Sequence, residues 1–171
     1  MTRAVRTISI TTQADFNKLA TNTANANAYS IATTIGGDTF YQDEIVGIQF
    51  GSDVTATALV AQGSSYYFLP YVVNMSQPVV LPNVITDLPT YFGYSWVSFN
   101  QPLVLSTNIT TLSDKFFVNA YAFNQPIDLS HITTIGNGVF TRACSFNQPL
   151  DLSSVITIGN DFLQGYIYSN N

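Results

Sequence analysis

One short phrase recurs in the second half of the chain at a nearly constant interval. It reads MSQP at Met75 and FNQP at Phe99, Phe123 and Phe146, so the steps between the four copies are 24, 24 and 23 residues. Sequences with a period of about 20–50 residues fold as stacks of similar units, because one unit cannot bury its own apolar face and must pack against its neighbours. This period limits what the chain can fold into more than any other feature does.

The apolar residues of each unit follow the same order. After Gln-Pro, two apolar residues stand at a spacing of two, which predicts a short strand with one buried face. The pairs are Val79/Leu81, Leu103/Leu105, Ile127/Leu129 and Leu150/Leu152. A second apolar pair and an aromatic residue complete the unit and predict an irregular return leg. We therefore expect a repeat solenoid, mainly β, whose strands form a parallel ladder.

The last two units resemble a known repeat family. Their phrases ITTIGNGVFTRACSFNQPLDLS and VITIGNDF are similar to the BspA-type leucine-rich repeat, and the FNQP opening resembles a mycoplasma-lipoprotein-like variant of that repeat. The resemblance extends from Met75 to about Tyr168 and is weaker in the first unit, where Met75 and Ser76 replace Phe and Asn. It implies a curved solenoid that serves adhesion or binding, generally without catalysis.

Three regions are expected within one continuous domain. Residues 1–29 are predicted to form an N-terminal cap with a short helix over Thr12–Ala20. Thr12 is the expected N-cap, and the carboxylate of Asp15 is favoured in the first turn. The helix would cover the first open unit, as the ends of solenoids require. Residues 75–171 are predicted to hold the four regular repeats of 23–24 residues.

Residues 30–74 are predicted to be degenerate repeats with an enlarged loop. The segment TTIGGDTF (Thr33–Phe40) shares five of its eight residues with TTIGNGVF (Thr133–Phe140) in the third unit. The apolar segment Ile45–Phe50 is typical of a strand. The enlarged loop is expected near Ala61–Tyr67.

The composition argues against several classes of function. Only 9% of the residues are charged, and a net charge of −5 with five basic residues predicts no surface for nucleic acid. No apolar segment is long enough to cross a bilayer, so membrane insertion is not expected, and the N-terminus lacks the apolar region of a secretory signal. A weakly charged, polar surface is common on secreted, cell-surface and virion proteins. We expect a virion or cell-surface location, with a cytoplasmic one as the alternative.

Catalysis is not expected, and neither a cofactor nor a metal is expected. The single Cys144 and the single His131 lack the spacing of a metal site. Asp128 and Asp151 fall at the same outward position of adjacent units, which places them about 5 Å apart on neighbouring strands. Paired carboxylates can serve acid–base chemistry or hold a cation. A solvated surface row is favoured, because no other acid or histidine completes a catalytic set.

Two groups of side chains are candidates for contact with a partner. The first is an aromatic patch of a kind enriched in recognition surfaces, although packing around the predicted loop is its alternative. It consists of Tyr66, Tyr67, Tyr91, Tyr94 and Trp96. The second is the last unit, whose strand is followed by no capping element; the alternative there is a tail that folds back over the end. This assembly edge is predicted to consist of Leu150, Leu152, Phe162, Tyr166 and Tyr168.

The asparagines of the FNQP phrase form a column. Asn100, Asn124 and Asn147 are predicted to be a structural ladder, in which each side chain bonds to backbone groups at the turn into the strand. A polar binding row is the alternative interpretation.

These features favour a non-catalytic structural or adhesive repeat module of a virion or cell surface. The expected partners are protein subunits of a larger assembly, or a host surface receptor or glycan, and a homo-oligomer could form through the C-terminal unit. A cytosolic interaction scaffold is the first alternative. A glycan-active enzyme that uses Asp128 and Asp151 is the second, and ice binding through the recurring threonines is the third.

Overall fold

The computed structural model describes residues 5–12, 14–15, 20–21, 32–35, 37–41, 44–51, 67–68 and 72–165. Within these residues the fold is mainly β with short, largely parallel strands, α-helix is confined to residues 14–15, and no helix could cross a membrane. The strands are β1 (Arg6–Ile10), β2 (Ala20–Thr21), β3 (Ala32–Ile35), β4 (Asp38–Tyr41), β5 (Ile45–Phe50), β6 (Tyr67–Phe68), β7 (Val79–Val80), β8 (Leu103–Val104), β9 (Thr111–Leu112), β10 (Thr134–Ile135) and β11 (Thr157–Ile158). The prediction of a mainly β fold is confirmed.

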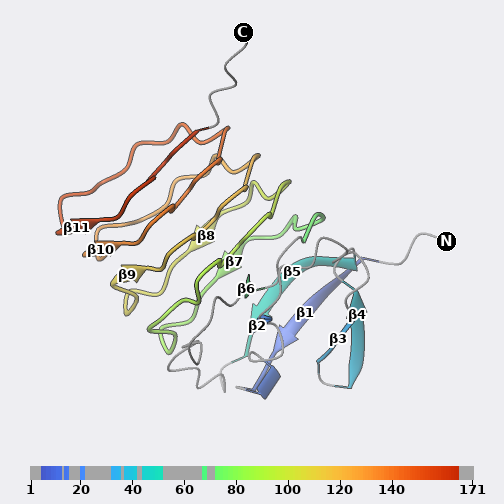
Figure 1. Ribbon diagram of the computed structural model, residues 1–171. Helices are drawn as coiled ribbons and strands as arrows, with labels where there is room; N and C mark the ends of the chain where they lie inside the picture. The colour runs from blue at the N-terminus through green and yellow to red at the C-terminus, as the bar shows by residue number, and fades with distance from the viewer. Residues whose placement is uncertain are drawn as a thin grey trace, which may run out of the picture.

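The N-terminal sheet consists of β1 and β5, which run parallel (Figure 1). Ile8 and Ile48 pair directly across it, and both are buried. Arg6 links β1 to two neighbouring segments. Its guanidinium donates to the Glu44 carboxylate at 3.2 Å and lies 4.2 Å from the centre of the Phe40 ring in β4. β5 corresponds to the strand that the sequence predicts there.

The prediction of a degenerate repeat at Thr33–Phe40 is wrong. This segment belongs to an antiparallel hairpin of β3 and β4, in which Ile35 pairs with Asp38 and Gly37 adopts a φ of +92°. Glycine enters this left-handed region without the steric cost of a side chain, and short glycine-containing turns bring two strands back together. The similar phrase at Thr133 leads instead into the parallel strand β10, because neighbouring units supply its pairing partners.

Of the helix predicted over Thr12–Ala20, residues 14 and 15 are helical, and residues 13 and 16–19 lie outside the described part of the chain. The hydroxyl oxygen of Thr12 accepts a hydrogen bond from the backbone N–H of Asp15 at 3.1 Å, as an N-cap does. Ala20 instead begins β2, which pairs antiparallel with β6, so the prediction of a helix through Ala20 is wrong. A pairing partner far along the sequence overrides the local helix preference. β6 begins at Tyr67, the predicted end of the enlarged loop, and residues 61–66 lie outside the described part of the chain.

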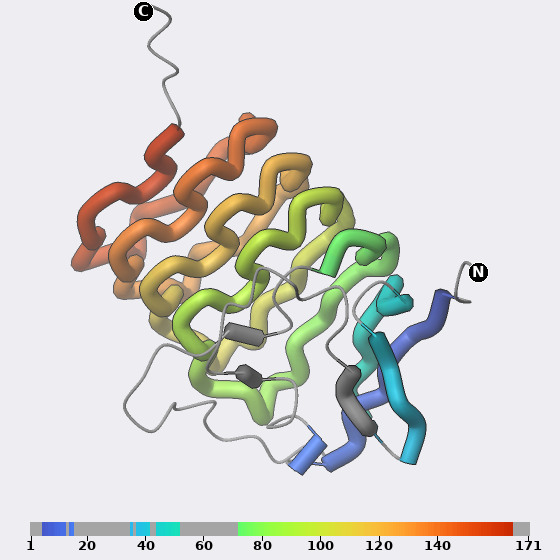
Figure 2. Tube along the Cα trace, turned by 45° about the vertical axis from the view of Figure 1, so that its right-hand side comes forward, coloured from blue at the N-terminus to red at the C-terminus, as the bar shows by residue number. Residues whose placement is uncertain are grey.

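From residue 72 onward, successive units of the chain lie side by side, as Figure 1 and Figure 2 show. The carbonyl of Val46 in β5 accepts hydrogen bonds from the N–H groups of Ser76 and Gln77 at 2.9 and 3.0 Å, which attaches the first unit to the N-terminal sheet. β7 and β8 then pair in parallel, as do β9, β10 and β11. Paired residues are 24 positions apart in β7 and β8 and 23 positions apart in β9, β10 and β11. The pairing therefore joins the apolar columns that the sequence predicts, such as Val79 with Leu103 and Leu112 with Ile135.

The strand predicted after Gln-Pro forms in the first two units only. Valine holds the outward position of β7 and β8, whereas Asp128 and Asp151 hold it in the last two units. Each carboxylate accepts a hydrogen bond of 2.9 Å from the backbone N–H two residues ahead, on Ser130 and Ser153. Local bonds of this kind compete with a strand ladder. The predicted strands of the third and fourth units are therefore absent from the structure described, although Ile127 and its equivalents keep their inward positions.

The return legs, predicted to be irregular, have a regular backbone. In a stretch of about five residues in each leg, every second residue has a positive φ, for example 62° at Lys115, 56° at Phe117 and 60° at Asn119. Nine of the described residues other than glycine have a positive φ. This conformation costs each of them about 1–3 kcal/mol of folding free energy. Hydrogen bonds between units offset this cost: the N–H groups of Lys115 and Asn119 donate to the third unit, and that of Phe117 donates to the first.

Aromatic rings fill the interior between the units. Phe99, Phe123 and Phe146 form one stack of nearly parallel rings, with centroids 5.8 and 5.9 Å apart. Phe117 connects this stack to Trp96, since its ring centroid lies 4.9 Å from Phe123 and 5.6 Å from Trp96. All of these rings except Phe146 are fully buried. Neighbouring units therefore hold each other together through a shared aromatic core.

Candidate functional site

The predicted asparagine column is part of the scaffold. The side-chain carbonyl of Asn100 accepts a hydrogen bond from the backbone N–H of Asn124 at 2.9 Å, and that of Asn124 accepts one from Asn147 at 2.8 Å. The side-chain amides of Gln125 and Gln148 donate to the same two oxygens at 3.1 Å. These oxygens are occupied within the protein, so the column joins units rather than offering a polar binding row.

A second side-chain ladder, which sequence reasoning missed, follows the return legs. Asp114 Oδ1 accepts a hydrogen bond from the backbone N–H of Asn137 at 2.7 Å, and Asn137 Oδ1 accepts one from Asn160 at 2.9 Å. The available signal was the recurring phrase IGN. The phrase needs glycine because the backbones of neighbouring units approach each other closely there. A Cβ on Gly136 would stand 2.7 Å from the backbone nitrogen of Asp114.

The members of the predicted aromatic patch lie in different environments. Trp96 is fully buried with its ring centroid 5.3 Å from that of Phe99, so its prediction as a contact residue is wrong. A large aromatic side chain contributes more by filling the core than by facing water. Tyr91 and Tyr94 are half-buried and meet edge to face at 5.4 Å. Of the other two predicted residues, Tyr67 belongs to β6 and Tyr66 lies outside the described residues.

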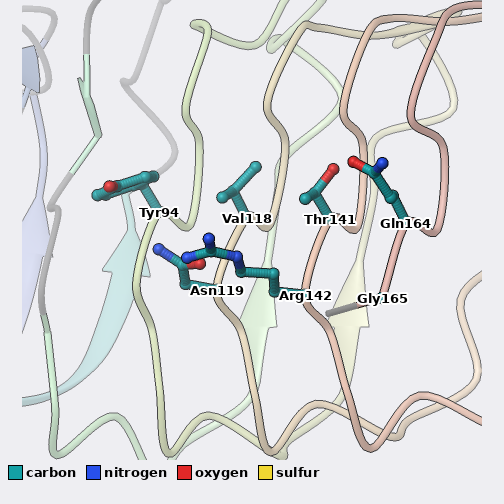
Figure 3. Close-up of a pocket in the computed structure, with 7 residues that line it drawn as sticks. All are labelled: Tyr94, Val118, Asn119, Thr141, Arg142, Gln164 and Gly165. Carbon is teal, nitrogen blue, oxygen red and sulfur yellow. The ribbon is translucent and has the colours of Figure 1, made fainter. Parts of the chain in front are cut away.

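Tyr94 lines a hollow that crosses all four units, with a volume of about 400 Å³ (Figure 3). We call it the return-leg hollow. Its lining consists of Tyr94, Val118, Asn119, Thr141, Arg142, Gln164 and Gly165. Figure 3 shows the side chain of Arg142 extended across the units toward Asn119 and Tyr94. A row of polar groups from consecutive units thus faces one shallow space.

The fold fixes the polar groups of the return-leg hollow. The Nδ2 group of Asn119 donates to Ser95 Oγ at 3.2 Å, whereas its Oδ1 atom is buried and has no hydrogen-bond partner among the described residues. The backbone N–H of Arg142 donates to the carbonyl of Gln164 at 2.8 Å. Sequence reasoning missed this site because the residues of one column differ in chemical type: Tyr94, Val118, Thr141 and Gln164.

Asp128 and Asp151 are surface carboxylates that the chain itself stabilises as anions. The backbone N–H of Ser130, and then its hydroxyl, lower the pKa of Asp128 below its usual value. The hydroxyl of Ser153, and then its backbone N–H, lower the pKa of Asp151 in the same way. The negative charge of Asp128 raises the pKa of Asp151, but it is the smallest of the causes that act on that pKa. Repulsion between the two carboxylates is therefore a minor effect.

Asp128→Asn is expected to leave the free energy of unfolding at pH 7 unchanged within about 0.5 kcal/mol. The asparagine oxygen can still accept the N–H of Ser130. A lowered pKa in the folded state adds stability above the unfolded value of 3.8, and that stability is lost as the pH falls through the folded value. Urea unfolding at pH 7 and pH 3 should therefore show a larger fall in midpoint for the wild type than for the variant. Equal falls would contradict the assignment.

Three of the five residues predicted for the assembly edge come together at the fourth unit: Leu150, Leu152 and Phe162. They line a largely apolar hollow of about 510 Å³, here called the C-terminal hollow, to which Phe146 and Leu163 also belong. The leucines and phenylalanines of the third unit are buried, whereas Phe146, Leu150, Leu152 and Phe162 are only partly so. Ile158 in β11 of the same unit is 48% exposed. Tyr166 and Tyr168 lie outside the described residues.

The remaining reactive side chains are scattered. No group of three or more His, Cys, Asp or Glu side chains that could hold a metal occurs in the part of the chain that the structure describes. Cys144 is an exposed free thiol at the C-terminal hollow. His131 is half-buried in the third unit, and its Nε2 atom finds no hydrogen-bond partner among the described residues.

Comparison of the chain with protein-family models, with curated proteins and with solved structures gives no match. The resemblance to the BspA-type repeat therefore rests on the residues of the units themselves. Two features of the structure bear on function: the polar return-leg hollow and the apolar C-terminal hollow.

Proposed function

We propose that the chain is a non-catalytic structural or adhesive module of a virion or cell surface. Residues 75–165 would form a repeat solenoid similar to the BspA-type leucine-rich repeat. Parallel strands, two side-chain ladders and stacked rings that recur at 23–25 residues support this. Each unit of such a stack contacts only its neighbours, which leaves an extended and rigid outer surface for contacts. The weak surface charge is typical of virion and cell-surface proteins.

The open edge of the fourth unit is the observation that carries this proposal. In the third unit, the carbonyl groups of Thr133 and Ile135 accept hydrogen bonds from the fourth unit. The corresponding carbonyl groups of the fourth unit, on Ile156 and Ile158, accept none from the described residues. A strand edge in this state, next to partly exposed apolar side chains, favours pairing with another protein chain.

A second copy of the chain is the partner that this edge fits best. β11 is the terminal strand of its sheet, so two copies related by a two-fold axis could pair it antiparallel with itself. Edge strands that must stay unpaired usually carry charge, whereas the only charged residues of the fourth unit are Asp151 and Asp161. The contact would also cover the C-terminal hollow.

Ile158→Lys is expected to weaken self-association about tenfold or more, measured by sedimentation velocity over a concentration series. A lysine on the edge strand opposes pairing, and the fold should persist because Ile158 is 48% exposed. Val104→Lys is the matched control, since Val104 is 50% exposed and its strand β8 belongs to a different sheet from β11. A monomer at every concentration, or equal weakening by both lysines, would contradict the proposal.

A glycan-active enzyme is the less well supported alternative. Its general acid needs a carboxyl group with a raised pKa, whereas hydrogen bonds lower the pKa of both Asp128 and Asp151. A cytosolic interaction scaffold would use the same contacts. The cellular fraction that contains the assembled protein distinguishes a scaffold from a surface module.

A further inference from the structure

We propose that the C-terminal hollow is a docking site for the segment of the same chain that follows Gly165, residues 166–171. The segment would begin a fifth unit that packs on the fourth. It lies outside the described part of the chain, so its place is inferred from the groups that the fourth unit leaves open. The inference goes beyond the proposed function and does not depend on it, because β11 is not part of the hollow.

The repeat keeps its register up to the start of this segment. The carbonyl of Gln164 accepts the N–H of Arg142 at 2.8 Å, just as the carbonyl of Thr141 accepts the N–H of Asn119 at 3.0 Å. Gly165 therefore stands where Arg142 stands one unit earlier, and Figure 3 shows Asn119, Arg142 and Gly165 in one row. If the step of 23 residues continues, residues 166–171 lie over residues 143–148. Five of the residues that line the hollow belong to this range: Ala143, Cys144, Phe146, Asn147 and Gln148.

One series of backbone hydrogen bonds between units stops at the hollow. The carbonyl of Val97 accepts the N–H of Ala122 at 3.2 Å, and the carbonyl of Tyr121 accepts the N–H of Ser145 at 3.1 Å. The next carbonyl of the series, on Cys144, accepts no hydrogen bond from the described residues. The N–H of Tyr168 is the donor that the register supplies to it.

The asparagine column stops at the same place. Asn100 Oδ1 and Asn124 Oδ1 each accept the backbone N–H of the asparagine one unit ahead, whereas no described residue donates to Asn147 Oδ1. The residue 23 positions after Asn147 is again an asparagine, Asn170. Its backbone N–H would continue the column. Docking of the segment would in this way complete two hydrogen-bond series that join every earlier pair of units.

Tyr166 supplies the apolar group that fills the hollow. It continues the column of Trp96, Ala120 and Ala143. Trp96 and Ala120 are fully buried, so this column points inward and already holds an aromatic ring in the first unit. A ring at Tyr166 would pack on the partly buried side chains of the fourth unit. Tyr168 continues a different column, in which Ser145 is exposed.

The test is disulfide formation between the native Cys144, an exposed thiol, and a cysteine placed in the segment. Ile167→Cys would bring the two Cα atoms to about 5 Å, the spacing of neighbouring strands, which a disulfide can bridge. Asn171→Cys is the matched control, because its loop to Cys144 is only four residues longer. Without a fixed register the two loops would close at nearly equal rates, since closure entropy changes slowly with loop length.

With oxidised glutathione at low protein concentration, Ile167→Cys is expected to cross-link within one chain at least about tenfold faster than Asn171→Cys. Added to Ile167→Cys, Tyr166→Ser should slow the reaction at least about fivefold, and Tyr168→Ser should change it by less than about twofold. Mass spectrometry and non-reducing gels identify the products.

Equal rates for the two cysteines, equal slowing by the two serines, or disulfide-linked dimers as the main product would overturn the inference. None of these results decides the self-association through β11, which Ile158→Lys tests separately.

Discussion

Phe123→Ala is expected to lower the free energy of unfolding by about 3–5 kcal/mol, as large-to-small changes in a packed core do. The Phe123 ring is fully buried and packs against rings of both neighbouring units. Its centroid lies 5.8 Å from that of Phe99 and 4.9 Å from that of Phe117. Removing the ring leaves a cavity between units that the hydrogen-bonded backbone cannot close. Urea unfolding followed by the fluorescence of Trp96, the single tryptophan, measures the loss.

Thr111→Ala is the control for this experiment. Thr111 is exposed in β9 and pairs with Thr134 through the backbone, which the substitution leaves intact. Its expected effect is within about 0.5 kcal/mol, the usual range for surface changes. Similar losses at the two positions would mean that the aromatic stack does not hold the units together.

Gly93→Ala is expected to cost about 3–4 kcal/mol, for two reasons that add. Gly93 has a φ of +70°, a conformation in which a side chain is strained. A Cβ at this position would also overlap the ring of Phe117, whose centroid is only 4.8 Å from that of Phe116 and which has no room to move aside. The same unfolding measurement detects this loss.

Gly37→Ala measures the backbone strain without the steric overlap. Gly37 has a φ of +92°, but a Cβ there would meet no atom within 4 Å. Only the backbone strain remains, so the free energy of unfolding should fall by about 1–2 kcal/mol. Circular dichroism measures this unfolding. A loss at Gly93 no larger than that at Gly37 would show that the ring yields, and that the core is packed less tightly than the structure indicates.

The register of the units could be predicted from the sequence, because the FNQP phrase marks the same structural point in each copy. Phe99 and Phe123 begin their units, and both rings enter the core. The period-two pattern after Gln-Pro also predicted the buried positions Leu103 and Leu105. It could not predict that Asp128 turns the chain locally, since a carboxylate fits an exposed strand position equally well on pattern alone.

The return legs could not be predicted, because their conformation contradicts local preference. Residues such as Lys115, Phe117 and Arg142 adopt positive φ, which sequence patterns assign to glycine. Hydrogen bonds to neighbouring units, 22 to 25 residues away, hold them there. The return-leg hollow depends on this backbone and was missed for the same reason, whereas the leucines of the C-terminal hollow followed from the repeat itself. Trp96 was assigned to the surface because a run of aromatic residues does not show which ring turns inward.

The reactivity of Cys144 toward a thiol reagent, measured while the chain assembles, tests most directly the claim that the C-terminal unit makes the contact. Cys144 is the only cysteine, it is exposed, and it lines the C-terminal hollow, so no substitution is needed to follow that surface. If the edge of the fourth unit is the contact, the reaction rate should fall in proportion to the assembled fraction measured by sedimentation. Assembled protein in which Cys144 reacts as fast as it does in the monomer would contradict the claim.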